Sequence, residues 1–183
     1  MLEPLAVARN LIGKRLVSYA HGIRVAGMIY ETEAYDGEQD LACHARTGKT
    51  SRNAIMYEEG GHAYVYFTYG MHWMFNCVTG AAGCPAAVLV RAIIPTEGIE
   101  TIRMIREPIP QRHWCDGPGK LTRALGINGK HNGADLCSIE SLITIENGDD
   151  IADVKVRMTP RIGIDRAPEP WKSKPWRFIA DIR

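Results

Sequence analysis

An aromatic segment in the first half of the chain constrains the fold most. Residues 62–76 read HAYVYFTYGMHWMFN and hold six of the fourteen aromatic residues in this chain of 183. Aromatic and β-branched residues around a central glycine are typical of a β-hairpin. The segment therefore predicts a hairpin that turns near Gly70 and places Tyr69 and Met71 at or beside its tip.

The tip is unusual because turns normally consist of small polar residues. Large apolar side chains such as Tyr69 and Met71 indicate a part that inserts into a partner, and a stack of nucleic-acid bases is one such partner. The alternative is an ordinary buried hairpin whose aromatic residues belong to the core. The segment by itself is compatible with both interpretations.

The remaining patterns predict an α+β fold. Helices are expected at residues 4–11, at 97–106 with Thr96 as the cap, and from Pro118 to a stop at Gly126. Strands are expected at residues 16–19, 24–35, 86–94, 142–145 and 154–158. Hairpin-connected strands with interspersed helices favour a largely antiparallel sheet, flanked by helices, in one compact domain over residues 1–183. Residues 36–53 lack periodicity and predict a functional loop or a short irregular helix.

Composition excludes several classes of protein. No run of eighteen apolar residues occurs, and residues 1–13 lack the pattern of a signal peptide, so we expect a soluble intracellular protein with no membrane partner. The five cysteines are scattered, and none form a C-x-x-C pair. This pattern predicts reduced thiols and indicates neither a disulfide framework nor a zinc site.

Positive charge is unevenly distributed, although the formal net charge is only +1. Residues 155–183 carry eight Lys or Arg against three acidic residues, and residues 46–52 carry three basic residues and no acid. Such asymmetry is compatible with a basic face for nucleic acid. A solvated surface is the alternative explanation for each cluster.

Two carboxylates stand two residues apart in the segment ETEAY. If this segment is extended, Glu31, Glu33 and Tyr35 share one face, with the carboxylates roughly 7 Å apart. An acidic pair at such a separation suits glycosidic chemistry, in which one carboxylate directs water at the carbon that loses its leaving group. The alternative is a solvent-facing strand end with two hydrated glutamates. Tyr35, His44 and Tyr66 offer flat surfaces for a planar ligand nearby.

Arg91 interrupts the apolar run AAVLVRAII, where a buried charge requires a partner. Glu33 or Glu31 is the natural candidate. Arg91 could instead lie at the end of its strand and reach solvent.

Two further positions could contact a nucleic acid. Residues 115–125 superficially resemble a phosphate loop but lack the Walker pattern, so a nucleoside triphosphate site is not expected. The start of the predicted helix, with Lys120 and Arg123, could still hold a backbone phosphate. The amide of Asn76 could discriminate between base edges, or simply cap a strand.

Taken together, these segments make the chain resemble the alkyladenine (3-methyladenine) DNA glycosylase family. The matching segments keep their order along almost the whole chain, which makes the set specific. They are ETEAY (31–35), the loop to His44, SRN (51–53), YVYFTYGM (64–71) with Asn76, LVRA (89–92), GPGKL (117–121) and PRIGI (160–164).

The resemblance implies a role for each matching residue. Glu33 would be the general base that activates water against C1′ of the damaged nucleotide, and Arg91 with a main-chain carbonyl of residues 161–164 would hold that water. The other roles concern DNA: Tyr35, His44 and Tyr66 would sandwich the flipped base, Asn76 would exclude guanine, Tyr69 and Met71 would enter the duplex, and Arg52 and Lys120 would contact its backbone.

The resemblance also implies one compact domain with a curved antiparallel sheet, without metal or cofactor. The expected activity is release of alkylated and deaminated purines from damaged double-stranded DNA by a monomer that does not cut the strand, because no lysine is expected at the water site. The expected location is the cytoplasm or nucleoid of a bacterium, or the nucleus of a eukaryote. A nucleoside or glycoside hydrolase and a noncatalytic nucleic-acid stacking module are the rival hypotheses.

Overall fold

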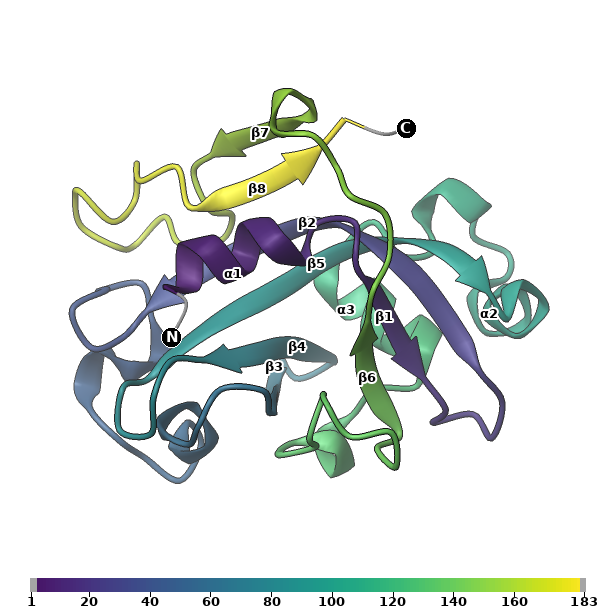
Figure 1. The fold of residues 1–183 in the computed structure, drawn as a ribbon, viewed down its shortest axis with the longest axis horizontal. Coiled ribbons are helices and arrows are strands. Elements are labelled where there is room, and N and C mark those ends of the chain that lie inside the picture. Colours follow the sequence, from purple (N-terminus) through teal and green to yellow (C-terminus); the bar gives the residue numbers. More distant parts are fainter. Residues whose placement is uncertain (1–2, 182–183) are drawn as a thin grey trace.

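The computed structural model describes residues 3–181 and shows one curved antiparallel sheet of eight strands (Figure 1). The strand order is β3-β4-β5-β2-β1-β6, with β8 beside β2 and β7 beside β8. This arrangement confirms the predicted α+β fold. The strands are β1 Arg15–Ser18, β2 Val25–Asp36, β3 Ala63–Thr68, β4 His72–Thr79, β5 Ala86–Glu97, β6 Ile143–Glu146, β7 Val156–Thr159 and β8 Arg177–Ala180; the helices are α1 Pro4–Leu11, α2 Ile99–Arg106 and α3 Pro118–Leu125.

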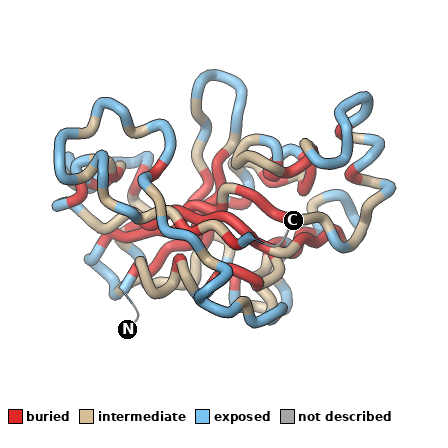
Figure 2. The backbone as a smooth tube through the Cα atoms, turned by 90° about the horizontal axis from the view of Figure 1, so that it is seen from above, coloured by how far each residue is buried: buried red, intermediate tan, exposed pale blue. Residues whose placement is uncertain are grey.

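Strand β2 is the centre of the sheet. It pairs with β5 along most of its length, with β1 along its first part and with β8 along its second part. Helix α1 crosses one face of this strand (Figure 1), where the Thr32 hydroxyl donates to the Ala8 carbonyl at 2.8 Å. Because side chains alternate along a strand, Glu33 points to the opposite face. Figure 2 shows the buried strands through the middle of the molecule, with exposed loops around them.

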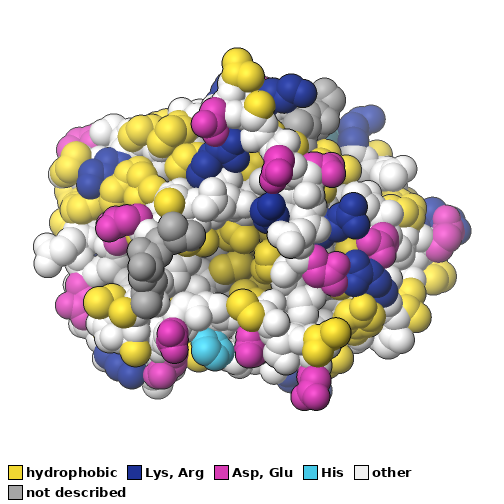
Figure 3. All heavy atoms as spheres, in the orientation of Figure 1, with side chains coloured by type: hydrophobic (Ala, Val, Ile, Leu, Met, Phe, Trp, Pro, Cys, Tyr) yellow, Lys and Arg dark blue, Asp and Glu magenta, His cyan; other side chains and the backbone are white. Residues whose placement is uncertain are grey.

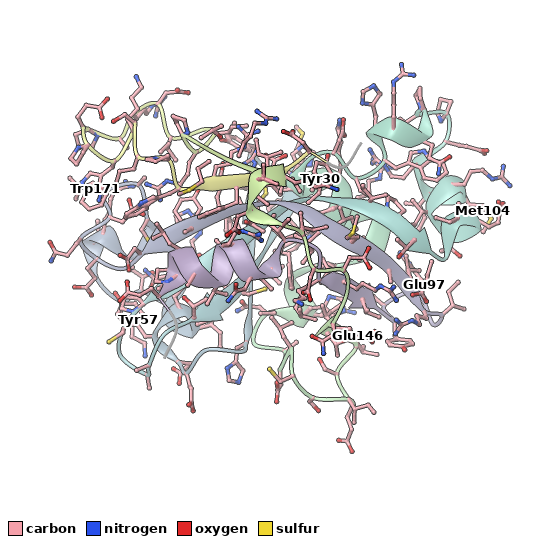
Figure 4. The ribbon with its side chains drawn as sticks, turned by 45° about the horizontal axis from the view of Figure 1, so that its top comes forward. Tyr30, Tyr57, Glu97, Met104, Glu146 and Trp171 are labelled. Atoms are coloured by element: carbon pink, nitrogen blue, oxygen red, sulfur yellow. The ribbon has the colours of Figure 1, made fainter. Side chains whose placement is uncertain are left out.

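Arg24, which precedes β2, links the ends of two strands of the sheet. Its guanidinium donates to Glu97 at the end of β5 (2.7 Å) and to Glu146 at the end of β6 (2.8 Å). Figure 4 shows these two glutamates close together at one end of the molecule. The three side chains are partly exposed, so the ion pairs stabilise the fold only modestly.

The predicted start of the second helix is wrong. Strand β5 continues to Glu97, which pairs with Ala26 of β2, and the Thr96 hydroxyl donates to the Ala26 carbonyl at 3.3 Å rather than capping a helix. Helix α2 begins at Ile99 after Gly98, whose φ is +68°. Strand pairing overrides the local cap signal here. Strand β8 was not among the predicted elements.

The aromatic hairpin is confirmed and has an exposed tip. Tyr64 is buried at its base, whereas Tyr69 and Met71 at its tip are 77% and 68% exposed. Tyr69 has φ +51° and Gly70 has φ +66°, and the Met71 N–H donates to the Thr68 carbonyl at 3.2 Å. Within residues 3–181, Tyr69 alone among non-glycine residues has a positive φ. Such backbone conformations cost about 1–3 kcal/mol and occur where function demands them.

All five cysteines are free; three are buried and two are exposed. Along residues 3–181, no helix is long and apolar enough to cross a bilayer. The same residues contain no group of three or more His, Cys, Asp or Glu side chains placed to hold a metal ion.

Candidate active site

A cavity of about 310 Å³ lies on the face of the sheet opposite α1. Its volume is at the lower end of the roughly 300–1,000 Å³ of small-molecule sites. Six of the predicted site residues line it: Tyr35, His44, Tyr66, Tyr69, Asn76 and Arg91. The wall is completed by Pro118 of α3, by the 42–44 loop and by residues 162–164.

A second hollow, of about 410 Å³, opens on the α1 face of the sheet. It lies between α1, β4 and β6, and Figure 3 shows hydrophobic side chains gathered in it. Among the described residues that line it, Glu59 is the only acidic or basic one. None of the predicted site residues lines this hollow, whereas six of them line the first cavity, so we place the candidate active site in the first.

One row of the sheet lies under the active-site cavity, and three of its five residues, Tyr64, Asn76 and Leu89, line it. Leu89 of β5 pairs with Asn76 of β4 on one side and with Glu33 of β2 on the other. The row extends to Tyr64 on β3 and to Arg177 on β8. Directly paired residues project from the same face of a sheet, so these five side chains all point toward the cavity side.

An irregularity in β5 brings Arg91 to the same face. Glu31 pairs with Ala92 and Thr32 pairs with Val90, which leaves Arg91 as an extra residue, a β-bulge. Bulges re-aim side chains, and here the bulge turns Arg91 toward the two glutamates. Its Nε donates to Glu31 Oε1 at 2.9 Å, and its Nη1 lies 3.3 Å from Glu33 Oε1. The prediction that a carboxylate pairs with Arg91 is confirmed, and the solvent-exposed alternative is wrong, because its side chain is only 13% exposed.

Glu33 is completely buried and is held by three donors. Its Oε1 accepts the Ile162 N–H at 2.7 Å and faces Arg91, and its Oε2 accepts the Tyr35 hydroxyl at 2.9 Å. Burial raises the pKa of this carboxyl above its ordinary value, while Arg91 and the two hydrogen bonds oppose the rise. A carboxyl with a raised pKa, next to a cavity and fixed in orientation, is suited to accept a proton.

His44 and Tyr66 form one wall of the cavity. Their ring centroids are 4.6 Å apart with an interplanar angle of 72°, and His44 Nδ1 lies 2.9 Å from the Tyr64 hydroxyl oxygen. Burial, together with the cations of Arg52 and Arg46, lowers the pKa of His44 to about 4. The imidazole is therefore neutral at physiological pH, which spares a cationic ligand from charge repulsion.

Tyr35 also lines the cavity and is supported by a buried ion pair. Arg161 lies 4.6 Å from the centroid of its ring, and donates to Asp40 at 2.5 and 3.0 Å. Both charged side chains are fully buried. The pair joins the loop that carries His44 to the segment that carries Ile162, and thereby fixes both sides of the cavity.

Asn76 lies on the cavity floor and is almost fully buried. Its amide nitrogen donates to the Tyr64 carbonyl across the hairpin at 2.9 Å. The interaction fixes the orientation of the side chain, so the amide is a rigid part of the cavity surface.

Four predicted residues do not line the cavity. Glu33 is buried behind three residues that do, Arg91, Tyr35 and Ile162. The other three lie outside it. Met71 is at the exposed hairpin tip, Lys120 pairs with Asp116 at 2.8 Å on the surface, and Arg52 lies 5.2 Å from the ring centroid of Tyr66. Arg52 also donates to the Phe67 carbonyl at 3.3 Å, so it supports the hairpin. Their contact with DNA stays a prediction.

The basic tail is only partly available to a polyanion. Arg157, Arg161 and Arg177 bind Asp181, Asp40 and Glu31 within the protein. Lys174 stacks over Trp171 at 3.7 Å in the loop between β7 and β8, where Figure 4 labels the tryptophan. Arg183, which the charge count included, lies outside the described residues.

Several residues of the site were not predicted. The alternation of Tyr64 with Tyr66 was a signal that both face the cavity, since residues two apart in a strand share a face. Asp40 and Arg177 carried no such signal, because their partners are distant in sequence. The Ile162 N–H, which binds Glu33, is a main-chain group that any residue except proline provides.

Comparison with known proteins identifies the family. Residues 2–182 match the family described as "Methylpurine-DNA glycosylase (MPG)". Relatives named "Putative 3-methyladenine DNA glycosylase" include one from Carboxydothermus hydrogenoformans, 45% identical over 96% of this chain and 89% of the relative. Those from Methanocella arvoryzae and Myxococcus xanthus are 47% and 45% identical over 95% of this chain, and over 86% and 83% of the relatives.

The match extends over almost the whole chain, including every strand and loop that contributes to the cavity. The chain belongs to the methylpurine-DNA glycosylase family.

Proposed function

We propose that this protein is a DNA glycosylase that removes damaged purines from double-stranded DNA by hydrolysis of the N-glycosidic bond. The observation that carries the proposal is the buried carboxylate of Glu33, held by Arg91, Tyr35 and the Ile162 N–H at the edge of an aromatic cavity. Family membership supports the same activity.

The chemistry requires a water molecule between Glu33 and C1′ of the nucleotide. Glu33 takes a proton from this water. The water oxygen bonds to C1′, and the bond from C1′ to the nitrogen of the nucleobase breaks. Arg91 and a main-chain carbonyl of residues 161–164 help to hold the water. A positioned base of this kind contributes about 10²- to 10⁴-fold in rate.

The cavity suits a planar base turned out of the duplex. Tyr35 on one side, and His44 with Tyr66 on the other, provide aromatic surfaces for it. Asn76 projects a fixed amide that clashes with the amino group of normal guanine. An alkylated purine is cationic and leaves readily, whereas hypoxanthine and ethenoadenine are neutral leaving groups that would benefit from protonation. The proposed substrates are 3-methyladenine, 7-methylguanine, hypoxanthine and ethenoadenine.

The exposed hairpin tip explains how a base reaches the cavity. Turning a nucleotide out of a duplex costs a few kcal/mol of stacking and pairing. Tyr69, with Met71 beside it, would enter the minor groove and fill the space that the base vacates. Tyr69 also lines the cavity, so the inserted residue is adjacent to the site that receives the base.

The product would be an intact strand with an abasic site. Cleavage of the strand by a glycosylase needs an amine that attacks C1′, and the described residues that line the cavity include no lysine. We therefore propose monofunctional hydrolysis.

The proposal is tested by measuring base release under single-turnover conditions. One substrate is duplex DNA with one central hypoxanthine, and the other is duplex DNA treated with a methylating agent. We expect free base from both, and strand breaks only after alkali. Breaks without alkali would refute monofunctional hydrolysis. Cleavage of free inosine at a comparable rate would instead support a nucleoside hydrolase. Inertness on every substrate, with retained binding to single strands, would support a stacking module.

A further inference from the structure

Glu33 belongs to a cluster of four charges with Arg91, Glu31 and Arg177, and the proposed chemistry uses only Glu33 and Arg91. Glu31 Oε1 accepts the Nε of Arg91 at 2.9 Å and the Nε of Arg177 at 2.7 Å. All four side chains are at most 19% exposed. The cluster therefore lies where charges interact strongly and water screens them weakly.

Arg91 is shared unequally between the two glutamates. Its hydrogen bond to Glu31 is 2.9 Å, whereas its closest approach to Glu33 is 3.3 Å. Without a second cation, one guanidinium would have to neutralise two buried carboxylates, and the shorter contact is with Glu31. Arg177 supplies that second cation from the far side of Glu31.

Arg177 reaches this place from the C-terminal strand. It is the register partner of Glu33 in the pairing of β8 with β2, and its Nη1 lies 3.3 Å from the Thr159 hydroxyl of β7. It does not line the cavity, and its guanidinium is turned to Glu31 and Thr159 rather than to a residue of the cavity wall. Any effect of Arg177 on the reaction must pass through Glu31 and Arg91.

We propose that Glu31 and Arg177 are positioning residues, and that Arg177 neutralises Glu31 so that the Arg91 guanidinium stays on Glu33 and keeps it ionised. This inference rests on the proposed function of Glu33 as a base. It makes strand β8, which does not touch the cavity, part of the catalytic apparatus.

The surroundings of Glu33 show why Arg91 is decisive. The groups that face Glu33 are Arg91 from β5, the hydroxyl of Tyr35 and the carboxylate of Glu31 from β2, the Ile162 N–H, and more remotely Tyr66 from β3. Arg91 makes the largest contribution that lowers the pKa of Glu33, and Glu31 raises it. A weaker contact with Arg91 and an unneutralised charge on Glu31 would therefore both raise the pKa of Glu33.

The test is the pH dependence of single-turnover base release by Arg177→Met. We expect the acid side of its profile to move to higher pH by about half to one unit, a roughly three- to tenfold lower rate there, with little change on the alkaline plateau. Arg177→Lys should keep the wild-type midpoint. Thr159→Val is the matched control, because it removes a contact of Arg177 without removing charge.

A double variant identifies the route of the effect. In Glu31→Gln/Arg177→Met the carboxylate that Arg177 neutralises is gone, so we expect the midpoint to return toward that of wild type. An equal loss of rate at every pH would show a merely structural role and overturn the inference, as would a double variant that shifts as far as Arg177→Met. If Arg177→Met does not fold, Arg177→Gln takes its place.

A direct titration separates this inference from the proposed function. The pKa of Glu33 is measurable by NMR on protein labelled at glutamate carboxyl carbons, with Glu33→Gln to assign the signal. A higher pKa in Arg177→Met without any base release from wild type would support the charge arrangement and refute the glycosylase proposal. Normal base release with an unchanged Glu33 pKa would refute the inference alone.

Discussion

Glu33 and Asn76 are both register partners of Leu89, and so stand two strands apart in one row of the sheet. The residue proposed to act on the sugar and the residue proposed to reject guanine therefore share one rigid support. The pairing of β4, β5 and β2 fixes the distance between them.

The backbone at the hairpin tip predicts opposite effects on stability and activity. Tyr69→Gly should increase the free energy of unfolding by about 1 kcal/mol, because glycine adopts the positive φ of +51° without strain. Tyr69→Ala should lack this gain. Both should slow base release from duplex DNA, since both lose the inserted ring. Chemical unfolding and single-turnover rates check the two effects, and unchanged rates in both variants would refute insertion.

The raised pKa of Glu33 predicts a pH-dependent effect of Glu33→Gln on stability. Because the pKa is higher in the folded than in the unfolded state, protonation favours the folded protein, and the wild type loses this contribution as pH rises through the folded pKa. Glu33→Gln does not titrate. Its melting temperature relative to that of wild type should therefore increase with pH. A difference that is constant from pH 4 to 8 would contradict the raised pKa.

His44 should titrate near pH 4, because burial and the nearby cations disfavour imidazolium. NMR of the imidazole ring measures this value. Arg52→Gln should raise it, since Arg52 is the first of the cations that lower it. A midpoint near the ordinary 6.5 would show that the ring is not buried as described. If His44 titrates near pH 4, an acid limb of the activity profile well above pH 4 belongs to Glu33 and not to His44.

The Asp40–Arg161 pair should be costly to break at one end. Asp40→Asn or Arg161→Met leaves a fully buried charge without its partner, which typically costs 3–5 kcal/mol, whereas the double variant should lose roughly the same or less. The exposed pair of Arg157 with Asp181 is the control, and Asp181→Asn should cost at most about 1 kcal/mol. Equal effects at both pairs, measured by urea unfolding, would contradict this account.

The sequence predicted the parts of the site that depend on local pattern. Alternation along residues 31–35 correctly placed Glu33 and Tyr35 on one face, and the run of aromatics with a central glycine predicted the hairpin. The buried run around Arg91 correctly predicted a carboxylate partner. Each of these signals is contained in one short segment of the sequence, where the geometry of a single strand or hairpin decides the outcome.

Other parts depend on contacts that no local pattern encodes. The bulge that turns Arg91 toward Glu33 is visible only in the register of two paired strands. Arg177 and Asp40 acquire their roles from partners more than 100 residues away. The charge count of the tail likewise could not show that three of its arginines pair with acidic residues of the protein itself, Arg161 and Arg177 in largely buried pairs and Arg157 in an exposed one.

The most direct test of the account compares wild type with Glu33→Gln on a duplex that contains one hypoxanthine, with affinity and single-turnover base release measured on the same DNA. We predict similar affinity and a loss of about 10²- to 10⁴-fold in the rate of base release, because the variant keeps the shape of the cavity and loses only the carboxylate that accepts the proton. Base release within a few-fold of wild type would contradict the assignment of Glu33.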